Sequence, residues 1–234
     1  MRVLAAVLLL GLLSPPALAA DVRAADVRVI KLDGVEVRLL PGTRQVVTVN
    51  RTTGTHARIV FWQHTARGWV NVVHSPRARI GYGGLVAPTR RRQNTGTTPI
   101  GTYALPFSFG SHPRPPAWRL PYRRYDANDY WVEDNASRYY NRYRSRELGG
   151  FRWWLDPNTL NGSERLAAYP RQYEMAVVIA FNYTRPVRYR GAGIFLHVNG
   201  SGPTAGCVSA PRPFLAFTLR TLRPDLHPVI AIGR

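Results

Sequence analysis

Hydrophobic residues cluster along this chain in runs of strand length. Six apolar runs are rich in β-branched residues and are bounded by turn-forming residues, as buried or half-buried strands require. The first three follow one another with only short turn-rich segments between them, which predicts a β-meander. A weaker alternation at 35–40 allows one further strand. The six runs cover residues 45–49, 57–64, 68–74, 174–183, 193–198 and 228–233.

One helix is predicted near the C-terminus. Leu215, Leu219 and Leu222 fall on one face of a helix, and Pro224 ends it. Ser209 is a candidate N-cap, with Pro211 near the first turn. We therefore expect a mainly β fold with a few helices, and a helix that begins just after Ser209.

Two regions are less regular. Residues 79–105 are rich in Gly, Thr and Pro, which predicts loops around short strands, and the arginines at 90–92 are interpreted as a surface contact for an anionic polymer. Residues 111–175 interleave tyrosine and tryptophan with arginine. Such side chains can stack on bases or sugars, or they can cover the edge of a core while arginine stays in water.

The N-terminus has the pattern of a secretory leader. Arg2 precedes the apolar run 3–13, and Ala17-Leu18-Ala19 forms a small-residue cleavage site. The run is short for a membrane span, although a retained anchor is the alternative. We expect a signal peptide at 1–19, a connector at 20–41 and one domain at 42–234. The protein is then exported to the periplasm or cell wall and touches the membrane only before the leader is cleaved.

The net charge changes the picture of the partners. The 234 residues carry 32 Lys and Arg against 13 Asp and Glu, a formal net charge of +19, and nearly all the basic residues are arginine. Such a charge attracts polyanions, although arginine richness can also follow from genome composition. For an exported protein the expected polyanions are anionic cell-wall polymers. Export and the lack of a recognisable module argue against nucleic acid, and nothing in the sequence calls for more than a monomer.

Cys207 is the only cysteine in the chain. Exported proteins use cysteines in disulfide pairs, so a single one is inert and buried, an intermolecular link or a reactive thiol. His197 stands ten residues earlier at the end of an apolar run, and Gly206 precedes the cysteine. An imidazole base, flexible backbone amides and a helix N-terminus beyond Ser209 would together activate a thiol and lower its pKa.

Other chemistries lack their motifs. The remaining histidines show no zinc-ligand spacing, and there is no Gly-x-Ser-x-Gly sequence, P-loop or dinucleotide fingerprint. We expect no metal and no cofactor.

The segment "GAGIFLHVNGSGPTAGCVSAP" resembles the signature of the L,D-transpeptidase catalytic domain, the YkuD-like family. Members have a strand ending in His, a glycine soon after, and then Ser or Thr, one residue, Gly and Cys. Three more stretches are similar to family elements, and the resemblance covers residues 42–234. These stretches are "TGTTPIGTY" (95–103), "WVEDNASRYYN" (131–141) and "GSERL" followed by "YEMAVVIAFNY" (162–183).

The resemblance implies a β-sandwich catalytic domain with an aromatic and arginine-rich insertion. Cys207 then matches the nucleophile and His197 the general base, whose imidazole is usually oriented by a backbone carbonyl. Gly206 matches the glycine of the oxyanion region, and Thr204 matches a hydroxyl near the substrate. Many members have His at the position of Ala205, and Arg or a similar polar group at the position of Ser209. These departures leave the nucleophile and the base intact and bear only on the details of substrate binding.

The implied activity is acyl transfer between peptidoglycan stem peptides. The thiolate attacks the carbonyl of the third residue and releases terminal D-alanine, and a second stem's amine takes the acyl group to form a 3→3 crosslink. Carbapenems generally serve the family as pseudo-substrates. Two alternatives stay open: an L,D-carboxypeptidase that uses water as acceptor, and a basic wall-binding protein with an inert thiol.

Overall fold

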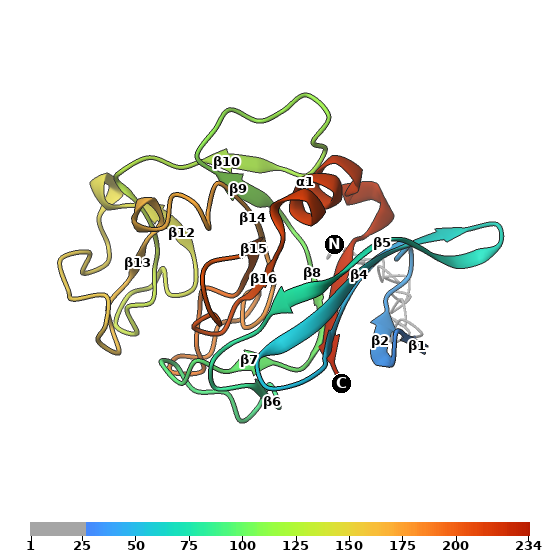
Figure 1. The fold of residues 1–234 in the computed structure, drawn as a ribbon. Helices are drawn as coiled ribbons and strands as arrows, with labels where there is room; N and C mark the ends of the chain where they lie inside the picture. Colours follow the sequence, from blue (N-terminus) through green and yellow to red (C-terminus); the bar gives the residue numbers. More distant parts are fainter. Residues whose placement is uncertain (1–26) are drawn as a thin grey trace, which may run out of the picture.

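The computed structural model describes residues 27–234, so the expected leader at 1–19 and the start of the 20–41 segment lie outside the described residues. Its centre is one curled ten-stranded sheet (Figure 1). In spatial order its strands are β10 (Tyr122–Arg124), β9 (Ser108–Gly110), β14 (Met175–Val178), β15 (Phe195–Val198), β16 (Val208–Ala210), β5 (Gly68–Arg79), β4 (His56–Thr65), β3 (Gln45–Arg51), β17 (Val229–Gly233) and β8 (Gly101–Ala104).

Smaller elements surround this sheet. Figure 1 shows a hairpin and a three-stranded sheet on opposite sides of the molecule. The hairpin is β1 (Arg28–Leu32) with β2 (Val35–Leu39); the three-stranded sheet is β12 (Tyr143–Ser145), β11 (Asp129–Trp131) and β13 (Glu164–Arg165); β6 (Leu85–Val86) pairs with β7 (Thr98–Pro99). The helices are α1 (Arg212–Thr221) and three short 3₁₀ turns, η1 (Arg146–Leu148), η2 (Leu166–Ala168) and η3 (Pro224–Leu226).

The expected fold class, mainly β with a few helices, is confirmed. All six predicted apolar runs contain strands of the large sheet, and β3, β4 and β5 form the predicted meander. Within residues 27–234, no helix is long and apolar enough to cross a membrane.

The central strands of the large sheet, such as β14, β16 and β17, are buried on both faces, which explains why they contain continuous apolar runs. In β14, Met175 and Val177 face an inner core shared with α1, whereas Ala176 and Val178 face an outer core beneath the three-stranded sheet. The inner core lies inside the curl of the sheet. Side chains on one strand therefore alternate between two environments, and this alternation positions the site described below.

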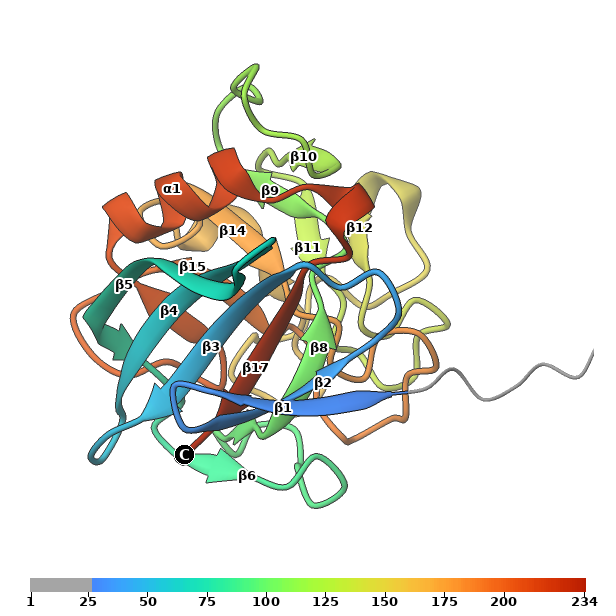
Figure 2. The same cartoon turned by 90° about the vertical axis from the view of Figure 1, so that its right-hand side faces the viewer.

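The hairpin covers the outer face at the other end of the sheet. Val35 and Val37 are buried with Val46 of β3 and Val229 of β17. Figure 2 shows the hairpin crossing β3, β17 and β8. The strand expected at 35–40 is present as β2, and β1, which its sequence pattern does not reveal, pairs with it along its whole length.

The predicted helix is present, but its predicted start is wrong. The helix begins at Arg212 with Pro211 as N-cap, and no side chain caps it. Ser209 instead lies in β16, where it pairs with His197 in β15 and Arg79 in β5. The backbone of Ser209 is paired in the sheet. Strand pairing therefore outweighs the local sequence pattern that predicts Ser209 as a helix cap.

Most of the aromatic residues between 111 and 175 cover the core. Tyr125, Trp131 and Tyr140 are buried in the outer core. Arginines stack over the ring faces of neighbouring, less buried aromatics, as Arg144 does over Tyr139 with its guanidinium carbon 3.5 Å from the ring centroid. The core-covering interpretation is therefore confirmed for these side chains.

Replacing Val37 by Ala tests whether the hairpin is an integral part of the fold. The side chain is 0% exposed, so we expect its loss to lower the free energy of unfolding by about 2 kcal/mol. Val29→Ala in the paired strand is the control, because Val29 is 52% exposed and should cost less than about 0.5 kcal/mol. Urea denaturation of both variants makes the comparison, and equal, small losses would mean that the hairpin is only loosely attached.

Candidate active site

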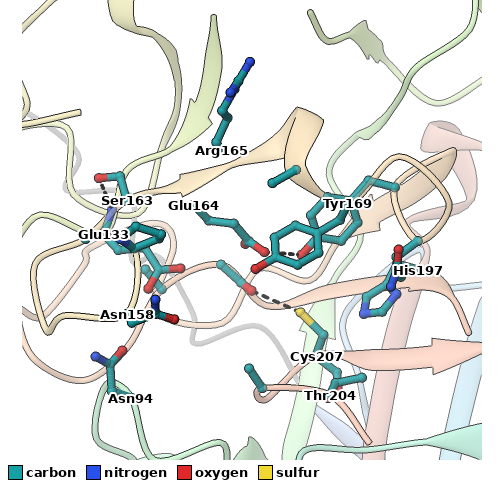
Figure 3. Close-up of a pocket in the computed structure, with 18 of the residues that line it drawn as sticks. Asn94, Glu133, Asn158, Ser163, Glu164, Arg165, Tyr169, His197, Thr204 and Cys207 are labelled. Atoms are coloured by element: carbon teal, nitrogen blue, oxygen red, sulfur yellow. Dashed lines mark hydrogen bonds between the residues drawn. The ribbon is translucent and has the colours of Figure 1, made fainter. Parts of the chain in front are cut away.

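A cavity of about 700 Å³ opens on the outer side of β15 and β16. Both Cys207 and His197 line it, together with the predicted Thr204 (Figure 3). Further walls come from the segment that precedes β14, from the insertion around β11 and β13, and from residues between 82 and 94. The cavity thus brings together the cysteine, the histidine and a part of the chain remote from both in sequence.

The register of two parallel strands places the cysteine beside the histidine. Leu196 in β15 pairs with Val208 in β16, and both side chains face the inner core. Because side chains alternate along a strand, His197 and Cys207 face the opposite side, where the cavity lies. Cys207 directly precedes β16, so the two side chains are diagonal neighbours across the ladder.

The Cys207 thiol is buried and held by backbone groups. Its side chain is 7% exposed, Sγ donates a hydrogen bond to the carbonyl of Gly193 at 3.2 Å, and it accepts one from the amide of Phe195 at 3.3 Å. Burial raises the pKa of the thiol, and Glu164 and Glu133 raise it further. The expected lowering of the pKa is therefore wrong for the resting site: the helix that was to provide it begins only after β16.

His197 is held as a neutral base. Nδ1 lies 2.8 Å from the carbonyl oxygen of Val198, and because a carbonyl only accepts, Nδ1 carries the proton and Nε2 is left as an acceptor. The ring of Tyr173 packs edge-on against the imidazole at a centroid distance of 5.4 Å. Burial lowers the pKa of His197 to about 4, against the opposing effect of the Val198 carbonyl. The orienting backbone carbonyl that the family resemblance implies is present.

Thr204 and Gly206 shape the turn before the cysteine. The Thr204 hydroxyl donates to the Cys207 carbonyl at 2.6 Å and accepts from the Gly206 amide at 3.2 Å. Gly206 adopts φ = +132°, which a residue with a side chain reaches only under strain. Both residues lie where the sequence places them, but their polar groups are engaged inside the turn. Their oxyanion and substrate roles stay predictions.

Thr98 supports the turn from below. Its fully buried hydroxyl donates to the Gly206 carbonyl at 2.8 Å and accepts from the Gly81 amide at 2.8 Å. The family-like stretch 95–103 contains Thr98, but the sequence gives no reason to expect it beneath Cys207. Thr98 and Gly206 are 108 residues apart in sequence, so only the fold reveals that they are in contact.

The stretch 131–141 holds the opposite side of the cysteine. Asn141 Oδ1 accepts from Trp131 Nε1 at 2.7 Å and from the amide of Gly193 at 3.1 Å. The carbonyl of that same Gly193 accepts the hydrogen bond from Cys207 Sγ. The family-like segment is thus a support for the backbone that contacts the thiol.

Two carboxyl groups, Glu133 and Glu164, face the cavity beside Gly193. A Cβ built on Gly193 would stand 2.7 Å from Glu133 Oε1 and 3.6 Å from Glu164 Oε2. The Tyr173 hydroxyl donates to Glu164 Oε1 at 2.6 Å. Burial raises the pKa of both carboxyls, and the proximity of Glu164 raises that of Glu133 further. Sequence reasoning missed this pair because its members lie on different segments.

The arginine triplet is split by the fold. Arg90 and Arg92 are exposed, as a polymer contact requires, but Arg91 is 3% exposed and lines the cavity. The interpretation of all three as a surface contact is therefore wrong for Arg91. Burial lowers the pKa of its guanidinium, with Glu133 and Cys207 acting in the opposite direction. Across the described part of the chain, no group of three His, Cys, Asp or Glu side chains is arranged to hold a metal ion.

Comparison with known families agrees with this geometry. Residues 44–224 match the family model described as the L,D-transpeptidase catalytic domain. No curated protein and no solved structure matches the chain. The family match spans all four predicted site residues and all three supporting stretches.

Thr98→Val tests the support beneath the turn. The substitution keeps the shape but leaves the Gly81 amide and the Gly206 carbonyl without their partner, so we expect unfolding to become easier by about 2 kcal/mol. Thr95→Val is the matched control, since the Thr95 hydroxyl is exposed, and its effect should stay within about 0.5 kcal/mol. Urea denaturation gives both values, and a Thr98 variant as stable as the control would contradict the role of this hydroxyl.

Proposed function

Because the chain belongs to the L,D-transpeptidase catalytic domain family, we propose that it is an exported acyltransferase that forms 3→3 crosslinks between peptidoglycan stem peptides. Cys207 is the nucleophile and His197 the general base. The observation that carries the proposal is the meeting of these two side chains on one face of adjacent parallel strands, inside a cavity large enough for a peptide.

In the first half-reaction, Sγ attacks the carbonyl carbon of the third residue of a donor stem. His197 Nε2 takes the thiol proton as the bond between sulfur and carbon forms. The peptide bond to D-alanine then breaks, and the imidazolium returns the proton to the leaving amine. A thioester on Cys207 and free D-alanine are the products. The neutral state of His197 supports this sequence, since only a neutral imidazole can accept the proton.

In the second half-reaction, the side-chain amine of a diamino acid in a second stem attacks the thioester. His197 accepts the amine proton, the new amide forms, and the proton returns to the departing sulfur. Glu133 and Glu164 suit an amine as acceptor, because burial raises their pKa values to about 8 and about 7, so near neutral pH the pair can both hold and accept a proton. An ionised carboxylate of the pair can take the extra proton of an ammonium group. This is the feature that supports crosslinking over hydrolysis.

The charge of the whole chain agrees with a wall-bound substrate. A net charge of +19 attracts anionic wall polymers and the carboxylates of stem peptides. We accordingly propose a periplasmic or cell-wall location and action as a monomer.

The direct test supplies purified protein with disaccharide tetrapeptides that carry a diamino acid at position three. We expect mass spectrometry to detect D-alanine and crosslinked dimers. D-alanine with only tripeptide would identify an L,D-carboxypeptidase, and intact substrate would leave a non-catalytic wall-binding protein.

Cys207→Ala should abolish both products and keep the wild-type melting temperature within a few degrees. In the wild type a carbapenem should add its mass to the protein, and because the chain has one cysteine, loss of the adduct in the variant assigns it to Cys207. His197→Gln should slow adduct formation by about 10²- to 10⁴-fold. Wild-type crosslinking by the folded Cys207 variant would end the proposal.

The protonation state of His197 distinguishes two possible resting sites: a neutral thiol with a neutral imidazole, and a preformed thiolate with an imidazolium. With a pKa of about 4, its imidazole should stay neutral as the pH falls from 7 to 5 and gain a proton only near pH 4. Nitrogen NMR can follow the change, with the signal assigned by its loss in His197→Gln. An imidazolium signal from His197 at pH 7 would contradict the neutral pair.

A further inference from the structure

Arg91 differs from its two neighbours in the arginine triplet in being held inside the protein. Its Nε donates to the carbonyl of Thr97 at 2.9 Å and its Nη1 to the carbonyl of Arg190 at 3.0 Å. The guanidinium carbon lies 5.4 Å from the ring centroid of Phe181. Within residues 27–234, the arginines that form ion pairs with carboxylates are Arg38, Arg58, Arg152 and Arg212, so Arg91 has no direct counter-ion there.

Two glycines make the space that this guanidinium fills. A Cβ on Gly191 would overlap Nη1, and a Cβ on Gly206 would stand 2.9 Å from Nη2. Gly206 directly precedes Cys207. The cation therefore lies against the backbone of the turn that carries the thiol, at a place that only glycine leaves open.

The charges around the thiol are otherwise unfavourable to a thiolate. Arg91 lowers the pKa of Cys207, against the larger effects of burial and of Glu164 and Glu133. Arg165 also lines the cavity, but its Nε donates to the Ala127 carbonyl and its side chain points away from Cys207 in Figure 3. A guanidinium keeps its proton even when buried, so Arg91 remains a cation beside the turn. Besides Arg91, the titratable groups that face Cys207 are Glu133, Glu164, Tyr169, Tyr173 and His197, and Tyr103 and Tyr140 face Arg91.

We propose that Arg91 is a positioning residue that stabilises negative charge on Cys207 during acyl transfer, acting through its electric field across the Gly206 turn. This inference rests on the proposed function only in that it takes Cys207 as the nucleophile. At an effective dielectric constant of about 20, a unit charge several ångströms from an ionisable group shifts the pKa of that group by about one pH unit or more. The hydrogen bonds of the Arg91 guanidinium fix its position relative to the turn, and its positive charge stabilises the thiolate.

Alkylation of the single thiol by iodoacetamide tests this without any substrate. Below the thiol pKa, the rate is proportional to the thiolate fraction and rises tenfold per pH unit. We expect Arg91→Met to react about tenfold more slowly than wild type between pH 7 and 9. Arg91→Lys, which keeps the charge, should stay within about threefold of wild type. Arg90→Met is the control for loss of one exposed arginine and should react at the wild-type rate, and all variants should react alike in urea.

The lysine variant separates charge from structure. If Arg91 only joined the Thr97 and Arg190 backbones, alkylation would follow the melting temperature, and Arg91→Lys would deviate as strongly as Arg91→Met. That result overturns the proposal, as does an unchanged rate in a folded Arg91→Met protein. If Arg91→Met does not fold, Arg91→Lys decides alone: a lower melting temperature with a near wild-type rate supports the field effect, and a tenfold loss of rate refutes it. Failure of crosslinking in the wild type, by contrast, bears only on the proposed function.

Discussion

The pairing of Leu196 with Val208 is the constraint on which the site depends. Both side chains are fully buried in the inner core, so a slip of one residue in either strand would turn apolar side chains toward the cavity and polar groups into the inner core. The same register turns His197 and Cys207 toward the other face. The hydrophobic core thereby fixes the relative position of the imidazole and the thiol, although neither belongs to the inner core.

Hydrogen bonds from segments remote in sequence further fix the backbone around Cys207. Thr98 fixes the carbonyl of Gly206, Thr204 fixes the carbonyl of Cys207, and Asn141 fixes the amide of Gly193. Each of these groups holds backbone, which has few alternative positions once its partner is in place. A thiol whose neighbours are backbone atoms held in this way needs little reorganisation when it attacks, and preorganisation of this kind lowers an activation barrier.

The sequence predicts the strands and the cysteine–histidine pair well because both follow local rules. Apolar periodicity marks β3, β4 and β14, and a histidine ending one strand shortly before a glycine-preceded cysteine leaves few geometries. It fails where tertiary pairing outweighs a local pattern, as at Ser209, which reads as a helix cap and is a strand residue. It also fails at Glu133, Glu164 and Arg91. Their charged side chains are the commonest markers of a surface, and only the cavity reveals that they face the thiol.

The electrostatics of the site bear on how a single cysteine would persist after the export that we propose. Burial favours the thiol over the thiolate and the imidazole over the imidazolium, and the two carboxyls strengthen the first preference. Oxidants and disulfides react with thiolates, so a protonated, buried thiol resists them in an oxidising compartment. In the proposed mechanism, attack on a substrate still needs negative charge on sulfur, but only while the proton moves to His197. A fixed cation close to the turn suits that requirement, because it favours the transient charge while burial keeps the resting thiol protonated.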